Sequence, residues 1–237
     1  MKIGKYEISG IYKEDCIAAM RTLPPECVDL IVTDPPYLTE YKSNRRKDKD
    51  HKFASEIMND DNPELIRDYF RECYRIAKPD TAIYAFCDID KIEYFKACVA
   101  DAGYHIKNVV IWVKDNWTAG DLEAQFGQQY ECIIYANKGR AKIRGKRWSD
   151  VWNFPKVPAA KLVHQNQKPV PLLSRAIEAH SKPGDIIFDG FAGSGSTCVA
   201  ARKLNRKYLA FELDTNEYAA AVKRIDHEFA QLSFLWD

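Results

Sequence analysis

Short apolar runs alternate with helical patterns along almost the whole chain, and this alternation constrains the fold more than any other feature of the sequence. The runs are nearly continuous in apolar residues, as in strands of a sheet covered on both faces, and they span residues 29–33, 81–86, 109–112, 132–136, 186–188 and 208–211. Between them, helices are predicted over residues 14–23, 63–77, 90–102, 169–181, 196–204 and 216–229. This order predicts an α/β fold with an open sheet between layers of helices.

The length and charge of the chain limit what it can do. Its 237 residues, without a recognisable linker, predict one domain over residues 1–237. The formal net charge is only +1, so contact with a nucleic acid must come from local clusters of basic residues. Two basic segments, 41–52 and 138–147, are predicted to be loops, and the candidate DNA contacts within them are Arg45, Arg46, Lys47, Arg140, Lys142, Arg144, Lys146 and Arg147.

Cysteine, histidine and apolar patterns exclude other classes of protein. The seven cysteines form no C-x-x-C pair, so we expect reduced thiols that lie mostly in the core. The five histidines lack the spacing of metal ligands, and no metal is expected. No apolar run approaches the roughly 18 residues of a membrane span, and the start lacks an apolar signal core. We therefore expect a cytoplasmic protein with no membrane partner.

A glycine-rich segment, DGFAGSGST at residues 189–197, follows one predicted strand, where open α/β sheets bind their ligands. Ser196 stands where a P-loop has its lysine, and the G-x-G-x-x-G spacing of a dinucleotide site is absent. Glu212 ends the next strand, and an acid there can accept hydrogen bonds from ribose hydroxyls. Together these features predict a nucleoside site without a phosphate; the alternative is a simple tight turn between strand and helix.

A second segment, TDPPY at residues 33–37, follows another predicted strand. Pro35 and Pro36 stiffen the backbone and remove two N–H donors. Asp34 and the Pro35 carbonyl can then accept both hydrogens of an adenine amino group, and Tyr37 offers a ring for base stacking worth about 1–3 kcal/mol. The alternative is a proline-stiffened loop in which Asp34 caps a helix.

The motifs in this order resemble those of β-class amino-group DNA methyltransferases, which carry the target motif before the cofactor loop. The resemblance covers residues 10–37, HQNQKP at 164–169, residues 182–214, and the closing Tyr218 and Arg224-Ile225. It implies a Rossmann-like fold with a mostly parallel sheet and S-adenosyl-L-methionine as cofactor. The sequence departs from the family's D-P-F where Gly190 replaces proline, which we expect to loosen that turn.

The resemblance also assigns residues to the cofactor. It implies contacts from Asp15 and Cys16 to the adenine of the cofactor and from Glu212 to its ribose, with Lys168 nearby. The methionine portion would lie against Phe191–Thr197, that is Phe191, Gly193, Ser194, Gly195, Ser196 and Thr197.

The reaction class can be narrowed from the residues. A cytosine C5 enzyme of the usual kind needs a Pro-Cys nucleophile, and the chain contains no such dipeptide. Cytosine N4 enzymes more often have serine where Asp34 stands, so the resemblance favours N6 of an adenine flipped out of double-stranded DNA. A cytosine N4 enzyme and a noncatalytic nucleic-acid or cofactor-binding protein remain the alternatives. As further partners, a second copy of the chain and a cognate restriction endonuclease are left open.

Overall fold

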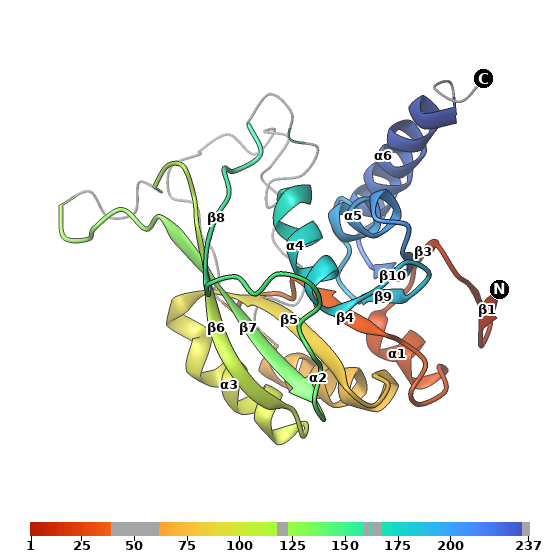
Figure 1. Ribbon diagram of the computed structural model, residues 1–237, viewed down its shortest axis with the longest axis horizontal. Helices are drawn as coiled ribbons and strands as arrows, with labels where there is room; N and C mark the ends of the chain where they lie inside the picture. Colours follow the sequence, from red (N-terminus) through yellow and green to blue (C-terminus); the bar gives the residue numbers. More distant parts are fainter. Residues whose placement is uncertain (39–61, 118–122, 159–161, 163–166, 234–237) are drawn as a thin grey trace.

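A computed structural model describes residues 1–38, 62–117, 123–158, 162 and 167–233 of the protein (Figure 1). Its centre is an eight-stranded sheet in the order β3-β10-β9-β4-β5-β7-β6-β8. The strands are β3 (Gly10–Lys13), β4 (Leu30–Thr33), β5 (Thr81–Cys87), β6 (His105–Val113), β7 (Tyr130–Lys138), β8 (Val151–Asn153), β9 (Ile186–Asp189) and β10 (Lys207–Glu212). A separate hairpin joins β1 (Lys2–Ile3) to β2 (Tyr6–Glu7).

The sheet is mostly parallel, as expected. Strands β3, β10, β9, β4 and β5 all run in one direction. Strand β7 is antiparallel to both of its neighbours, β5 and β6, while β8 is parallel to β6. The carboxyl ends of all strands except β7 therefore lie at one edge of the sheet, which we call the carboxyl edge.

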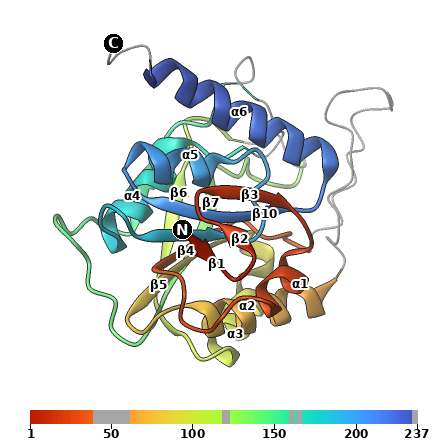
Figure 2. The ribbon, with the colours of Figure 1, turned by 90° about the vertical axis from the view of Figure 1, so that its right-hand side faces the viewer.

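Helices cover both faces of the sheet (Figure 2). One layer consists of α1 (Cys16–Arg21), α2 (Pro63–Ile76) and α3 (Ile92–Asp101), which follows the short η1 (Ile89–Lys91). The other consists of α4 (Val170–His180), α5 (Ser196–Lys203) and α6 (Thr215–Ser233). Side chains alternate along each strand between two buried clusters, so that Ile31 faces the first layer while Leu30 and Val32 face the second.

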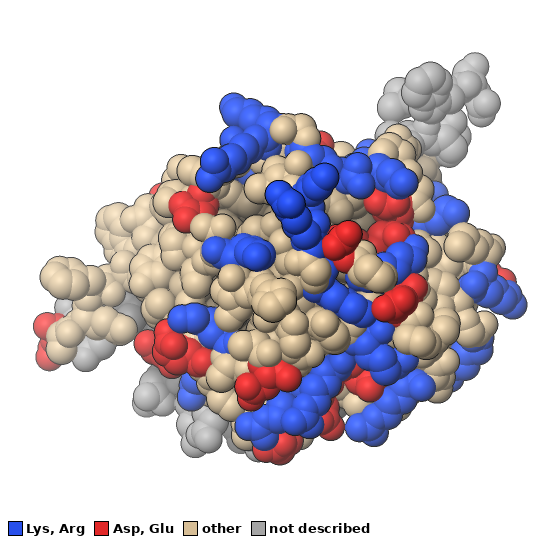
Figure 3. All heavy atoms as spheres, turned by 60° about the horizontal axis from the view of Figure 1, so that its bottom comes forward, with Lys and Arg blue, Asp and Glu red and all other residues tan. Residues whose placement is uncertain are grey.

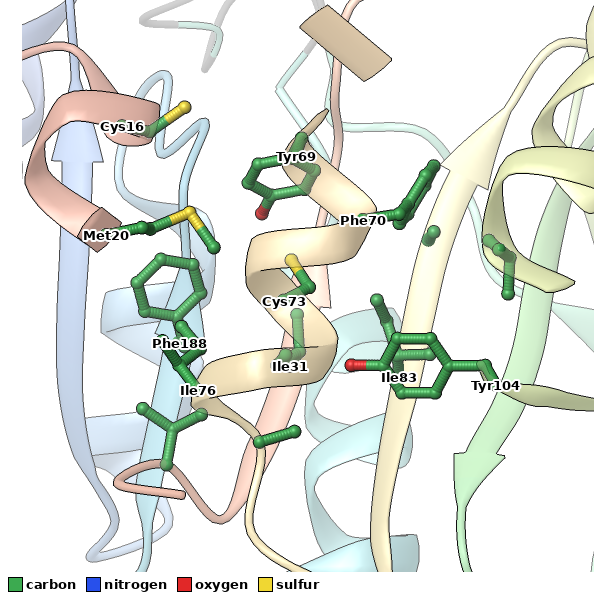
Figure 4. Close-up of a cluster of buried hydrophobic side chains, with 14 of the residues drawn as sticks. Cys16, Met20, Ile31, Tyr69, Phe70, Cys73, Ile76, Ile83, Tyr104 and Phe188 are labelled. Atoms are coloured by element: carbon green, nitrogen blue, oxygen red, sulfur yellow. The ribbon is translucent and has the colours of Figure 1, made fainter. Parts of the chain in front are cut away.

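The first cluster shows how the sequence pattern produces the layers. Helix α2 directs Tyr69, Phe70, Cys73 and Ile76 towards the sheet, at helical spacing (Figure 4). In the same cluster lie Ile31, Ile83 and Phe188 from three neighbouring strands. This buried apolar contact fixes α2 against the face of the sheet formed by β9, β4 and β5.

All six predicted strands and all six predicted helices are present, with shifted ends. The run at 109–112 is the second half of the longer β6. The hairpin β1-β2 was not predicted, nor were two short strands of the main sheet, β3 and β8. Both have only three or four residues and are partly exposed, so they lack a continuous apolar run. The seven cysteines are free, and six of them are buried, as expected.

The structure tests the loop prediction for only one of the two basic segments. Segment 41–52 lies outside the described residues. The loop prediction for 138–147 is wrong at its first residue, because Lys138 ends β7 and its Nζ donates to the carbonyls of Tyr74 and Ala77 at 3.1 and 2.7 Å. Within the described residues, no helix combines the length and apolar character that crossing a membrane requires.

Candidate functional site

The two motifs predicted to carry chemistry meet at the carboxyl edge. Strands β4 and β9 are neighbours, with Leu30 paired to Ile187 and Ile31 to Phe188. Asp34 and Phe191 each follow three residues after a paired position, so the two motifs leave the sheet side by side. Parallel neighbours in the sheet thus bring together segments that lie more than 150 residues apart in the sequence. Asp29 and Ile186, for example, are hydrogen-bonded although 157 positions separate them in the sequence.

The Asp34 carboxylate is held at both oxygens. The Tyr37 hydroxyl donates to Oδ1 at 2.6 Å, and Lys168 Nζ donates to Oδ2 at 2.6 Å. Asp34 retains 26% exposure of its side chain, so it is accessible from one side, whereas Pro35 is buried. This geometry does not support the alternative of a helix cap, because no helix begins at Asp34 among the described residues.

Lys168 lies in the Asp34 pocket and forms part of a buried charge network. Besides Asp34, its Nζ contacts Glu131 Oε2 at 3.2 Å, and Lys114 Nζ contacts Glu131 Oε1 at 2.7 Å. Burial opposes the charge of Lys168, but Asp34 and Glu131 outweigh that effect and raise its pKa. Burial likewise opposes the charge of Glu131, yet Lys168 and Lys114 lower its pKa to about 2. Lys168 and Glu131 are therefore both ionised at neutral pH.

Glu131 and Lys114 were not identified from the sequence. Lys114 directly follows β6, and Glu131 is the second residue of β7. The two strands are joined there by the pairing of Val113 with Tyr130 and by a hydrogen bond from the Lys114 N–H to the Gln129 carbonyl. The available signal was a charged residue directly after the apolar run of β6 and another directly before the apolar run of β7. Its partner Lys168 is distant in sequence, so only the fold connects them.

The glycine-rich segment closes onto β10. The Ala192 N–H donates to the Phe211 carbonyl at 2.9 Å, and the Gly193 N–H donates to Glu212 Oε2 at 2.7 Å. Gly193 has φ +48°, and a Cβ added there would have no atom within 4 Å. The missing side chain thus leaves open space above the backbone, as a site for close approach of a ligand requires. The loop fits a nucleoside cofactor.

Glu212 has acceptor capacity to spare. Its two oxygens accept the N–H groups of Gly193 and Asp214 at 2.7 and 2.8 Å. A carboxylate offers about four acceptor positions, so Glu212 can accept a further hydrogen bond from a ribose hydroxyl. Burial raises the pKa of Glu212 above its usual range, which is consistent with a partly dehydrated pocket.

The unpredicted strand β3 brings the start of the chain to the cofactor side. Lys13 pairs with Glu212, so Asp15 and Cys16 follow at the same edge. Asp15 caps α1 by accepting the Ala18 N–H at 2.8 Å. Cys16 is buried, and this burial raises the pKa of its thiol, so the side chain is a neutral one. Contact of either residue with the cofactor adenine stays a prediction.

Arg224, from helix α6, supports the glycine-rich segment from behind. Its guanidinium donates to the Ser194 carbonyl and hydroxyl at 3.1 Å each and to the Ser196 hydroxyl at 2.9 Å. Thr197 is also buried and hydrogen-bonds Asp189, whose pKa burial raises to about 7. Arg224 was noted in the sequence only as part of the closing motif, without this role.

Gly190 does not loosen the turn as we expected, because it is tightly packed. Its N–H donates to the Tyr69 hydroxyl at 3.2 Å, a bond that proline could not make. A Cβ at Gly190 would lie 2.5 Å from Tyr69 Cε2. Glycine at this position therefore accommodates the Tyr69 ring.

This packing predicts the cost of a side chain at Gly190. Gly190→Ala should lower the free energy of unfolding by about 1–3 kcal/mol, because the Tyr69 ring must shift in a close-packed core. Urea unfolding would measure the change. In a Tyr69→Leu background the same substitution should cost less; an equal cost in both backgrounds would show that the ring is not the obstacle.

The basic segment 138–147 lies away from this site. Lys138 pairs with Thr81 at the start of β5, whereas Thr33, which precedes Asp34, pairs with Ala85 near its end. At about 3.3 Å per residue, the segment begins roughly 15 Å from Asp34 along the strands. Its backbone is anchored by the bond from Arg144 N–H to the Ala179 carbonyl, at the far end of α4. The face that includes this opposite edge is rich in Lys and Arg (Figure 3).

The other residues predicted to contact DNA form two groups, one within the described residues and one outside them. The side chains of Arg140, Lys142, Arg144, Lys146 and Arg147 are exposed, and none has an ion pair with another described residue. Arg45, Arg46 and Lys47 lie outside the described residues. The structure thus brings together the target motif, Lys168 and the glycine-rich segment, but not the described basic cluster.

Comparison with known proteins identifies the family. Residues 28–223 match the N6_N4_Mtase family model, described as DNA methylase. YubD of Escherichia coli (strain K12) is 31% identical over 220 residues, which cover 92% of this chain and 90% of that protein. Type II methyltransferase M.HinfI of Haemophilus influenzae is 29% identical over 248 residues, covering 92% of this chain and 68% of that protein.

Solved structures agree on the fold. The M1.HpyAVI–SAM complex superposes with a TM-score of 0.71 at 23% identity, covering 91% of this chain and 98% of that chain. PvuII DNA methyltransferase, a cytosine-N4-specific enzyme, gives a TM-score of 0.74 at 14% identity, covering 98% and 96%. The fold is therefore that of the S-adenosyl-L-methionine-dependent methyltransferases. The chain belongs to the N6/N4 family of DNA methylases, and S-adenosyl-L-methionine is its cofactor.

Proposed function

We propose that this methyltransferase acts on the exocyclic N6 of adenine in double-stranded DNA, with the target base flipped into the pocket of Asp34, Pro35, Pro36 and Tyr37. The observation that carries the proposal is the position of Asp34 beside the glycine-rich segment on neighbouring strands, with its side chain 26% exposed and fixed by Tyr37. An acceptor held in this way suits an amine rather than a carbon nucleophile.

The residues of the chain would orient the two reactants. Asp34 and the Pro35 carbonyl accept the two N–H bonds of the amine, which directs the nitrogen lone pair towards the methyl group. Because positive charge develops on that nitrogen during transfer, the Asp34 carboxylate stabilises the transition state. Glu212 holds the ribose of the cofactor, and the backbone at Gly193 permits its close approach. When bound, S-adenosyl-L-methionine supplies the methyl group on a positively charged sulfur.

The identity of the methylated base distinguishes the two candidate reactions. Asp34 at the first motif position supports adenine, whereas cytosine N4 is the second candidate, because the PvuII enzyme of similar fold is cytosine-N4-specific. The purified chain should be incubated with methyl-labelled cofactor and unmethylated DNA, and the product digested to nucleosides. We expect label in N6-methyladenine. Label in N4-methylcytosine would establish the second candidate, and no label would establish a noncatalytic binding protein.

The basic segment supports a proposal for DNA contact at a distance from the target base. We expect Lys142 and Lys146 to neutralise phosphates, so replacing both with alanine should weaken binding to all long duplexes alike. The salt dependence of the logarithm of the affinity should fall by roughly one unit per lost contact, while turnover of saturated enzyme stays unchanged. Fluorescence anisotropy at several salt concentrations measures both.

Alanine at Lys96 and Lys223, on α3 and α6, provides the matched control. It removes the same charge from other faces of the protein and should leave the salt slope unchanged. If the Lys142 and Lys146 variant matches this control, the segment is a solvated surface loop, and the contacts are to be sought at Arg45, Arg46 and Lys47.

A further inference from the structure

The carboxylate proposed to hold the target amine already accepts a hydrogen bond at each of its oxygens. Its Oδ1 accepts the Tyr37 hydroxyl, and its Oδ2 accepts Lys168 Nζ, each at 2.6 Å. The ammonium of Lys168 is an N–H donor, as the amino group of a base is. In this structure, the lysine therefore competes with the target amine for one of the two Asp34 oxygens.

A second acceptor for Lys168 lies within reach. Glu131 Oε2 is 3.2 Å from the same Nζ, and the other Glu131 oxygen is held by Lys114 at 2.7 Å. The side chains of Lys168 and Lys114 are each 8% exposed and that of Glu131 is 17% exposed. Two carboxylates and two ammonium groups balance in charge within this network. A buried lysine that lost both carboxylates would be an unpaired charge, which is costly, so Lys168 needs an anionic partner whenever it leaves Asp34.

We infer that Lys168 donates to the Asp34 oxygen that the target amino group binds during the reaction, and that the amino group displaces it there. Glu131 is then a positioning residue, which holds the displaced Lys168. This inference rests on the proposed function. The transfer from Asp34 to Glu131 has a chemical reason: a cation left on Asp34 would oppose the positive charge that develops on the reacting nitrogen. It also gives selectivity, because a base edge without an N–H donor cannot replace the lysine on Asp34.

Glu131→Gln tests the anionic partner, because it keeps the shape of the side chain and removes its charge. Lys168 would then have Asp34 as its sole carboxylate partner within the described network and would compete more strongly with the target. We expect kcat/KM for DNA to fall roughly tenfold, mainly through a higher KM. Glu228→Gln is the matched control, since it neutralises a carboxylate 2.7 Å from Lys203, in an ion pair between α6 and α5, and it should leave both constants unchanged.

A second substitution separates positioning from a merely structural role. In the Glu131→Gln background, Lys168→Met should restore KM for DNA by several-fold, because the competitor for Asp34 is removed. Lys168→Met alone should lower KM for DNA below that of the wild type. If Glu131 simply stabilised the fold, the double variant would be worse than either single variant.

The outcomes are distinct. The inference would be overturned if the double variant had a KM for DNA no lower than that of Glu131→Gln. It would also be overturned if Lys168→Met alone abolished turnover without changing KM. The second result stands even if Glu131→Gln fails to fold. The rise in Tm with S-adenosyl-L-methionine should be retained in every folded variant. Failure of the proposed function would instead appear in the wild type, as the absence of methyl transfer to adenine.

Discussion

Asp34→Ala should lower turnover about a hundredfold, equivalent to about 2.7 kcal/mol of transition-state stabilisation. The expected loss is large because the carboxylate both orients the amine and stabilises the charge that forms on it. Affinity for S-adenosyl-L-methionine should stay within several-fold of the wild type, since Glu212 and the glycine-rich segment are separate from Asp34. Single-turnover methyl transfer and calorimetric titration with the cofactor measure the two quantities.

Asp34→Asn provides the comparison, because the amide keeps one acceptor oxygen but loses the charge. It should retain more turnover than Asp34→Ala and less than the wild type. Near-normal turnover in Asp34→Ala would exclude the proposed role of the carboxylate. Asp34→Ser should be less damaging for a cytosine target than for adenine, which connects this experiment with the identity of the target base.

The cofactor should raise the Tm of the wild type, and Gly193→Val should abolish that rise. A ligand that binds only the folded state stabilises it by mass action. Valine at Gly193 would place its branched side chain in the open space that the ligand requires, at a backbone φ of +48° that such residues rarely adopt. Differential scanning fluorimetry with and without S-adenosyl-L-methionine measures the shift.

Gly184→Val separates ligand exclusion from backbone strain. Gly184 also has a positive φ, +88°, and a Cβ there would likewise have no atom within 4 Å, but it lies in the turn before β9, at the opposite edge from the glycine-rich segment. Both variants should lose stability, and only Gly193→Val should lose the ligand-induced shift. A normal shift in Gly193→Val would mean that the cofactor approaches elsewhere.

The sequence predicted the parts of the fold whose local pattern is strong. Continuous apolar runs identified the strands that carry Asp34 and the glycine-rich segment, and glycine and proline marked the turns where those strands end. The sequence did not predict β3, because four half-exposed residues give no such run; yet β3 places Asp15 near Glu212.

The buried charge network could not be predicted from local sequence patterns, and the reason is a different one. The Glu131 carboxylate meets Lys114 through the register of an antiparallel pair, and it meets Lys168 through the packing of a distant segment against the sheet. Such encounters depend on tertiary structure. The resemblance assigned Lys168 to the neighbourhood of the cofactor, whereas its recorded polar contacts are with Asp34, Tyr37 and Glu131.

The pairing of β3 with β10 has a consequence for synthesis of the protein. The cofactor side of the site combines residues 10–16 from the start of the chain with Glu212 and Arg224 from near its end. During translation, β3 (Gly10–Lys13) therefore has no partner strand until β10 (Lys207–Glu212) has emerged. Contacts so distant in sequence form late and slowly. A nascent chain truncated before Lys207 would lack the strand that completes the nucleoside site, so the ability to bind cofactor should arise only after β10 has been synthesised.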